Sequence, residues 1–149
     1  IGTAAGSIPV TITDDGFKNP IFAKGLSQDL VEDKTSTSLE LGCPKFHFGN
    51  GDHVTIIPEN SIVLAKTDDS PALAIEYGNH CCWYSTQFHP ESSHLIWQYW
   101  VKENVIKNRS IDDYVPEATS NGCYLLRNFL QSTATVAANV TAIDADVGV

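Results

Sequence analysis

A histidine and a glutamate lie two residues apart in the stretch STQFHPESS, residues 85–93. His89 directly follows an apolar run, and Pro90 restricts the residue before it to an extended conformation. The carboxylate of Glu91 can therefore bond to one ring nitrogen of His89, which fixes the tautomer and leaves the other nitrogen to accept a proton. The spacing indicates a histidine base oriented by a carboxylate. The alternative interpretation of the same residues is a strand end capped by polar side chains.

The apolar run before His89 is the last of three short strands predicted in close succession. Residues 61–67, 72–77 and 81–88 are rich in β-prone side chains, and the breaks DDSP and GNH between them are typical of tight turns. This pattern predicts an antiparallel meander, with His89 at the carboxyl end of its last strand, where open α/β sheets gather functional groups. A further strand is predicted over 7–13, and apolar helical patterns over 92–106 and 119–132 predict a covering layer.

The composition restricts the expected partners. The chain has 149 residues, 42% of them hydrophobic, which predicts one domain or a large part of one. Its formal net charge is −9 and Lys and Arg do not cluster, so nucleic acid is not an expected partner. No apolar run approaches the ~20 residues that span a bilayer, so no membrane partner is expected. The chain begins at Ile1 and contains no Met, which indicates a processed or trimmed chain.

The cysteines indicate a cytoplasmic protein. They have no CxxC spacing, so we expect reduced, buried thiols rather than a zinc site or disulfides: Cys43, Cys81, Cys82 and Cys123. Two histidines, His47 and His53, flank the turn-like sequence GNGD at 49–52, and we expect them to be solvated loop residues rather than ligands.

Several segments resemble one enzyme family, the class I (triad-type) glutamine amidotransferases. TQFHPESS at 86–93 resembles the histidine and glutamate signature of that family, in which a strand ends in Gln-Phe-His-Pro-Glu. GDHVTIIPENSIVLAKTDDSPALAIEY resembles its Gly-Asp, Pro-Glu, strand and Ser-Pro turn, most closely in the guanosine-monophosphate-synthase type. NGCYLLRNFL resembles its closing helix, and NPIFAKGL resembles the short loop before its central strands.

The resemblance implies a fold and a division of the chain. The implied fold class is α/β, a partial flavodoxin-like three-layer sandwich with a mixed sheet and flanking helices. Residues 1–130 would be the C-terminal half of a class I glutamine amidotransferase domain, with a probable insertion at about 94–117. Residues 131–149 are expected to be a tail of uncertain order. Gly49 and Asn50 stand where the family pattern has Ser-His ahead of Gly-Asp.

The resemblance also implies a mechanism based on a Cys-His-Glu triad, without a cofactor or metal. A cysteine thiolate attacks the side-chain amide of glutamine and ammonia leaves; His89 would activate the thiol and protonate the ammonia, and Glu91 would orient His89. The nucleophile of the family lies in a Gly-x-Cys-x-Gly turn, which none of the four cysteines matches. Because IGTAAGSIPV resembles the end of the helix after that turn, we expect the nucleophile upstream of Ile1 and an inactive chain on its own.

The expected partners follow from this function. They are glutamine as substrate and either the N-terminal half of the same domain or a synthase domain or subunit that receives the ammonia. Two alternatives remain open. One is a γ-glutamyl peptide hydrolase of the same superfamily, with the aromatic segment 97–100 as a changed acceptor pocket, and the other is a non-catalytic amidotransferase-like binding module.

Overall fold

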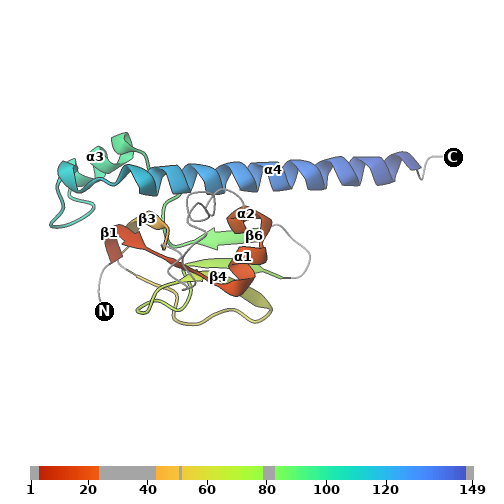
Figure 1. Ribbon diagram of the computed structural model, residues 1–149, viewed down its shortest axis with the longest axis horizontal. Coiled ribbons are helices and arrows are strands. Elements are labelled where there is room, and N and C mark those ends of the chain that lie inside the picture. The colour runs from red at the N-terminus through yellow and green to blue at the C-terminus, as the bar shows by residue number, and fades with distance from the viewer. Residues whose placement is uncertain (1–3, 24–42, 51, 79–82, 147–149) are drawn as a thin grey trace, which may run out of the picture.

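Two antiparallel sheets and four α-helices make up the part of the chain that the structure describes, residues 4–23, 43–50, 52–78 and 83–146 of a computed structural model. The smaller sheet pairs β1 with β3, and the larger sheet has the strand order β2-β4-β5-β6. The fold is therefore mixed α/β, with antiparallel strand pairing (Figure 1). The strands are β1 (Ala4–Pro9), β2 (Thr11–Ile12), β3 (Lys45–Asn50), β4 (Ser61–Lys66), β5 (Ala74–Tyr77) and β6 (Trp83–Thr86).

The predicted meander is confirmed by the β4-β5-β6 part of the larger sheet. Ile75 of β5 lies opposite Val63 of β4 on one side and opposite Ser85 of β6 on the other. Residues 81 and 82, which the prediction included in the last strand, lie outside the described residues.

The single strand predicted over 7–13 is two strands that belong to different sheets. The chain leaves the smaller sheet at Val10, whose N–H donates to the carbonyl of Pro44 at 2.9 Å, and joins the larger sheet as β2. Thr13 then caps α1 (Asp14–Lys18): its hydroxyl accepts from the Gly16 N–H at 2.9 Å and donates to the Val63 carbonyl at 2.7 Å. A second short helix, α2 (Pro20–Ala23), follows Asn19.

Both predicted helical segments form helices. The first contains α3 (His94–Lys102), which is followed by the 3₁₀ turn η1 (Ile111–Asp113). The second lies inside α4 (Pro116–Asp146), which runs across the strands, with α3 beside its N-terminal end (Figure 1). The helix α4 continues to Asp146 through residues assigned to a tail of uncertain order, since that stretch is rich in Ala and has no Pro or Gly before residue 148.

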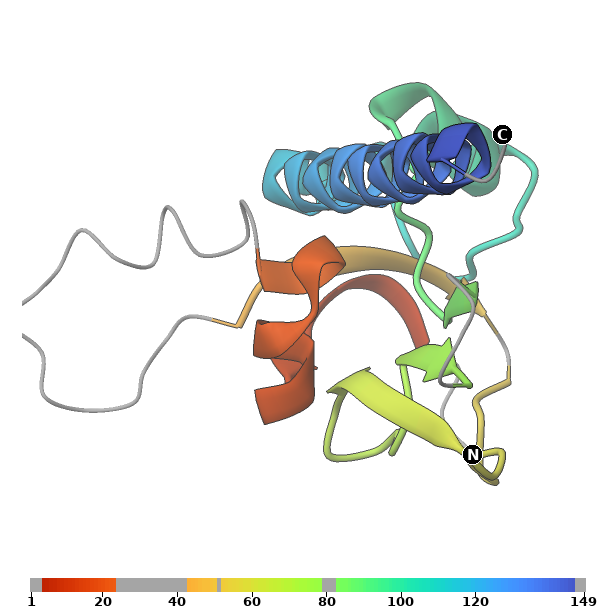
Figure 2. The ribbon, with the colours of Figure 1, turned by 90° about the vertical axis from the view of Figure 1, so that its right-hand side faces the viewer.

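The side chains of β3 alternate between two covered faces, because successive residues of a strand point to opposite sides. Phe46 and Phe48 belong to the core, where Phe88 stacks on Phe46 with a ring-centroid distance of 4.1 Å. His47 and Gly49 face the other way, toward α3. The helix α4 packs on β3 and α2, above the curved strands β1 and β3 in the second view (Figure 2). The core therefore lies on one face of β3 and the tryptophans of α3 lie on the other.

Gly122 allows α4 to cross directly over the segment that carries His89 and Glu91. A Cβ atom at this position would overlap the carbonyl oxygen of Pro90 and approach two further backbone atoms of the same residue. Two asparagines hold the helix in this place: Asn121 donates to the Lys45 carbonyl at 3.0 Å, and Asn128 donates to the Ile21 carbonyl at 2.8 Å. Because a Cβ at position 122 would overlap Pro90, the close approach of α4 to this segment requires glycine.

Replacing Gly122 by alanine is expected to lower the free energy of unfolding by about 1–3 kcal/mol, the usual cost of overpacking a filled site. The expected sign is informative because Gly-to-Ala substitutions in a helix interior ordinarily stabilise by about 0.5–1 kcal/mol. Urea unfolding followed by circular dichroism measures the change, with Ser120→Ala on an exposed turn of the same helix as the control. An unchanged or increased stability of the Gly122→Ala variant would show that α4 does not press on Pro90.

Candidate functional site

The pair predicted from the sequence is formed in the structure. His89 Nδ1 lies 2.8 Å from Glu91 Oε1, at hydrogen-bond distance. The two side chains are 33% and 56% exposed, so the pair lies at the surface. When the imidazole is neutral, Nδ1 carries the hydrogen that Glu91 accepts, and Nε2 keeps the lone pair that can take a proton.

The backbone places His89 at the junction of the two sheets. Beyond β6, the Gln87 N–H donates to the Leu73 carbonyl at 2.7 Å, and the His89 N–H donates to the His47 carbonyl of β3 at 2.8 Å. Phe88 between them enters the core. His89 thus follows the carboxyl end of the last strand of the meander, as expected, and its backbone is positioned by pairing with β3.

Helix α3 supplies an aromatic side chain beside His89. The ring centroids of His89 and Trp100 lie 4.9 Å apart at an interplanar angle of 71°, an edge-to-face arrangement. Gly49 of β3 lies next to both rings: the position of a Cβ on Gly49 would be 3.8 Å from His89 Nε2 and 3.7 Å from Trp100 Cζ3. Gly49 was not predicted to lie at His89, although the alternation of Phe46, His47, Phe48 and Gly49 indicates that His47 and Gly49 share a face. Trp100 was predicted near the site only as part of the aromatic segment 97–100 of the hydrolase alternative.

A second histidine, His47 of β3, lies beside His89 in the sheet pairing and is fully buried. Its backbone carbonyl binds the His89 N–H, and its ring lies under Trp97 and Tyr114, at centroid distances of 5.1 and 5.3 Å. The prediction that His47 is a solvated loop residue was wrong, because β3 extends through 45–50 and α3 covers this face. The other predicted loop histidine, His53, lies outside any helix or strand.

The hydrogen bonds of His47 fix its tautomer. The Thr119 hydroxyl must donate its only hydrogen to the Ser92 carbonyl, at 2.9 Å, because a carbonyl can only accept. Thr119 therefore accepts from Nε2–H of His47, at 3.2 Å, and from the hydroxyl of Tyr114, at 2.8 Å. The unprotonated Nδ1 of His47 accepts from the hydroxyl of Ser7, its cross-strand partner, at 2.9 Å. His47 is thus a neutral structural residue, with both ring nitrogens satisfied.

Burial lowers the pKa of His47 from 6.5 to about 4, since the charged form would lose its hydration. Between these values the unfolded chain binds a proton that the folded chain does not, so acid favours unfolding. The free energy of unfolding is expected to fall as the pH drops from 6.5 toward 4, by up to about 3 kcal/mol from this residue.

Urea unfolding at several pH values between 7 and 4.5 measures this dependence. A His47→Gln variant, which has no titratable group, should lose the part of the slope that lies in this window, and His53→Gln should keep it. Equal slopes in the wild type and the His47→Gln variant would contradict the assignment.

The described cysteines do not match the expectation of buried thiols. Cys43 and Cys123 are free and exposed, and Cys43 Sγ lies 4.0 Å from the hydroxyl of Thr11. Cys123 is exposed because α4 directs Leu125, and not Cys123, toward the core. Cys81 and Cys82 lie outside the described residues.

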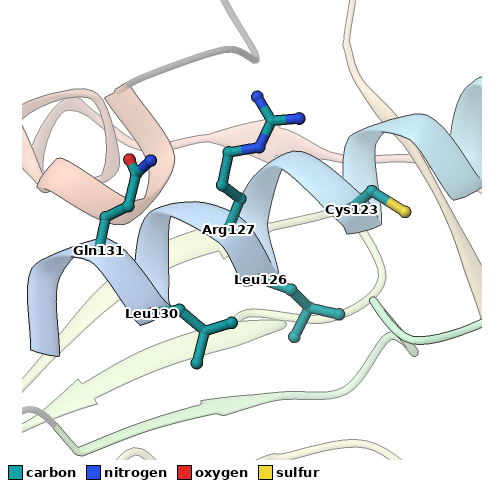
Figure 3. Close-up of a pocket in the computed structure, with 5 residues that line it drawn as sticks. All are labelled: Cys123, Leu126, Arg127, Leu130 and Gln131. Atoms are coloured by element: carbon teal, nitrogen blue, oxygen red, sulfur yellow. The ribbon is translucent and has the colours of Figure 1, made fainter. Parts of the chain in front are cut away.

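A shallow hollow on α4 is lined by two leucines and three more polar residues (Figure 3): Cys123, Leu126, Arg127, Leu130 and Gln131. The two leucines point together to one side of the helix, and Arg127 and Gln131 point to the other. The guanidinium of Arg127 lies over the ring of Tyr124, 5.4 Å from its centroid. The hollow includes neither His89 nor Glu91, so it is not the candidate catalytic site.

The fold and the site define a mixed α/β protein with antiparallel sheets and a surface His–Glu pair. In the described part of the chain, no group of three or more His, Cys, Asp or Glu could hold a metal ion, and no helix is long and apolar enough to cross a membrane. Comparison of the chain with protein-family models, curated proteins and solved structures found no match.

Proposed function

We propose that this chain carries the histidine and glutamate of a class I glutamine amidotransferase-type thiol hydrolase. The observation that supports the proposal best is the 2.8 Å hydrogen bond between His89 Nδ1 and Glu91 Oε1, within the Gln-Phe-His-Pro-Glu sequence. This bond gives Nε2 the lone pair that a general base needs.

The proposed reaction needs a cysteine that meets Nε2 of His89. The imidazole takes the proton of the thiol, and the thiolate attacks the side-chain amide carbon of glutamine. The C–N bond then breaks as the imidazolium returns the proton to the leaving ammonia, and water hydrolyses the glutamyl thioester to glutamate. We propose that this cysteine lies upstream of Ile1, since Cys43 and Cys123 lack the Gly-x-Cys-x-Gly context of the family. The chain alone would then be incomplete and inactive.

The proposed assembly follows from the same resemblance. The two sheets and their helices would form part of a flavodoxin-like three-layer sandwich that the N-terminal half of the domain completes. A synthase domain or subunit would use the ammonia, and the protein would act in the cytoplasm. The mixed α/β class of the described part of the chain is compatible with the α/β class of this arrangement.

A γ-glutamyl peptide hydrolase with the same His–Glu pair is the second candidate. The observation that favours it is the tryptophan beside His89: a large apolar ring at 4.9 Å is suited to pack against a substrate that continues beyond the γ-amide. A non-catalytic module is the outcome if no thiol hydrolase activity exists.

The test uses the gene product that contains this chain, incubated separately with L-glutamine and with a γ-glutamyl dipeptide. Glutamate release from glutamine, together with γ-glutamyl hydroxamate formed when hydroxylamine is added, would support the amidotransferase proposal. Release from the dipeptide alone would favour the second candidate. No release from either substrate, and no cysteine alkylated by a chloroketone analogue of glutamine, would reject both enzyme functions.

A further inference from the structure

We propose that Trp100 is a positioning residue for His89: its ring holds the imidazole so that Nε2 faces Gly49. The catalytic role of the held nitrogen rests on the proposed function. The arrangement of the two rings and Gly49 does not, because it can be measured without any substrate.

The bond to Glu91 holds the imidazole at one nitrogen, Nδ1. Both members of the pair are substantially exposed, at 33% and 56%, and a contact between exposed side chains contributes little stabilisation. A contact against the ring itself therefore restricts the imidazole further.

Trp100 supplies that contact from a rigid support. It lies three residues after Trp97 on α3, so the two indoles share a face of the helix, with ring centroids 6.5 Å apart. Trp97 is fully buried, and its indole N–H donates to the carbonyl of Ser110 at 3.1 Å. The N-terminus of the helix is capped by Ser93, whose hydroxyl accepts from the Ile96 N–H. Helix α3 is thus anchored by one tryptophan and presents the other to His89.

The direction of Nε2 is defined by Gly49. The point where a side chain would begin on this glycine lies 3.8 Å from His89 Nε2 and 3.7 and 3.8 Å from two carbon atoms of the six-membered ring of Trp100. One hydrogen of Gly49 therefore points at both rings. His89 Nε2 and Trp100 flank the same small space above β3.

The two histidines should have opposite tautomers, which gives the experiment an internal control. At pH 8, long-range proton–nitrogen correlations of the chain labelled in its histidines should show the Nδ1–H form for His89 and the Nε2–H form for His47. Nuclear Overhauser contacts should connect the His89 ring hydrogens with Trp100 and with the α-hydrogens of Gly49.

A Trp100→Leu variant should lose the nuclear Overhauser contact between His89 and Gly49, while both histidines keep their tautomers. Trp100→Phe, which retains an aromatic ring, and Tyr99→Leu, at an exposed position of the same helix, should behave as the wild type. An unchanged His89 spectrum in Trp100→Leu would overturn the proposal. If that variant does not fold, the nuclear Overhauser contacts of the wild-type chain test the proposal. The absence of contacts from His89 to Trp100 and Gly49 would overturn it, and their presence would support it.

Activity separates this proposal from the proposed function. In a gene product that hydrolyses glutamine, Trp100→Leu should lower kcat by about tenfold to a hundredfold, the cost of a misplaced catalytic group, and leave KM nearly unchanged. Lost spectroscopic contacts with unchanged kcat would overturn the positioning role in catalysis. The spectroscopic result is independent of whether any hydrolysis is found, so a failure of the proposed function would be recognised separately.

Discussion

Replacing His89 by alanine is expected to lower glutamine hydrolysis by the gene product at least a hundredfold, and up to about ten-thousandfold. The imidazole is proposed to act twice, first by taking the thiol proton and then by giving it to ammonia, and no other side chain is proposed to replace it. Steady-state glutamate release measures the loss, which should lie in kcat rather than in KM.

The matched control is His94→Ala, since His94 is an exposed histidine on α3 that contacts Gln98 and Tyr114. This variant should retain the wild-type rate and so exclude a general effect of losing a histidine. Full activity in the His89→Ala variant would reject the role of His89 even if the protein hydrolyses glutamine.

Truncating Trp97 to alanine is expected to lower the free energy of unfolding by about 3–5 kcal/mol, the usual cost of removing a large buried aromatic side chain. The indole is fully buried, covers the ring of His47 and satisfies the carbonyl of Ser110. Its loss leaves a cavity above β3 and an unpaired carbonyl. Since the free energy of unfolding of many domains is only about 5–15 kcal/mol, this change is expected to remove a large part of it.

Chemical denaturation of the Trp97→Ala variant measures this cost, and Tyr99→Ala is the matched control. Tyr99 is an aromatic residue two positions along the same helix, and it is 60% exposed. Its truncation should change the stability by no more than about 0.5 kcal/mol. A similar small change for Trp97 would mean that α3 does not seal this face of β3.

Local patterns were sufficient to predict the elements that depend on neighbouring residues. The β4-β5-β6 meander follows from alternating apolar residues and short turns, and the bond between His89 and Glu91 follows from their spacing around Pro90. The contacts that depend on distant residues could not be predicted. Nothing in the sequence around His47 indicates that Trp97, fifty residues later, covers it, because that contact depends on how α3 returns to β3.

The break between β1 and β2 was missed for a related reason. Residues 7–13 have the composition of one strand, and the change of sheet at Val10 is determined by its bond to Pro44 on another segment. The length of α4 was missed because an Ala-rich sequence without a strong apolar pattern gives a weak signal, although its helix propensity is high.

The burial of His47 beneath α3 has a consequence for how far this part of the chain can be shortened. The resemblance assigns residues 94–117 to an insertion, yet this segment supplies the two tryptophans that cover His47 and contact His89. Without this segment, the face of β3 that carries His47 and Gly49 would meet water, and such a face needs different side chains from one that packs against indole rings. Shortening the chain here should therefore require substitutions at positions 47 and 49 as well.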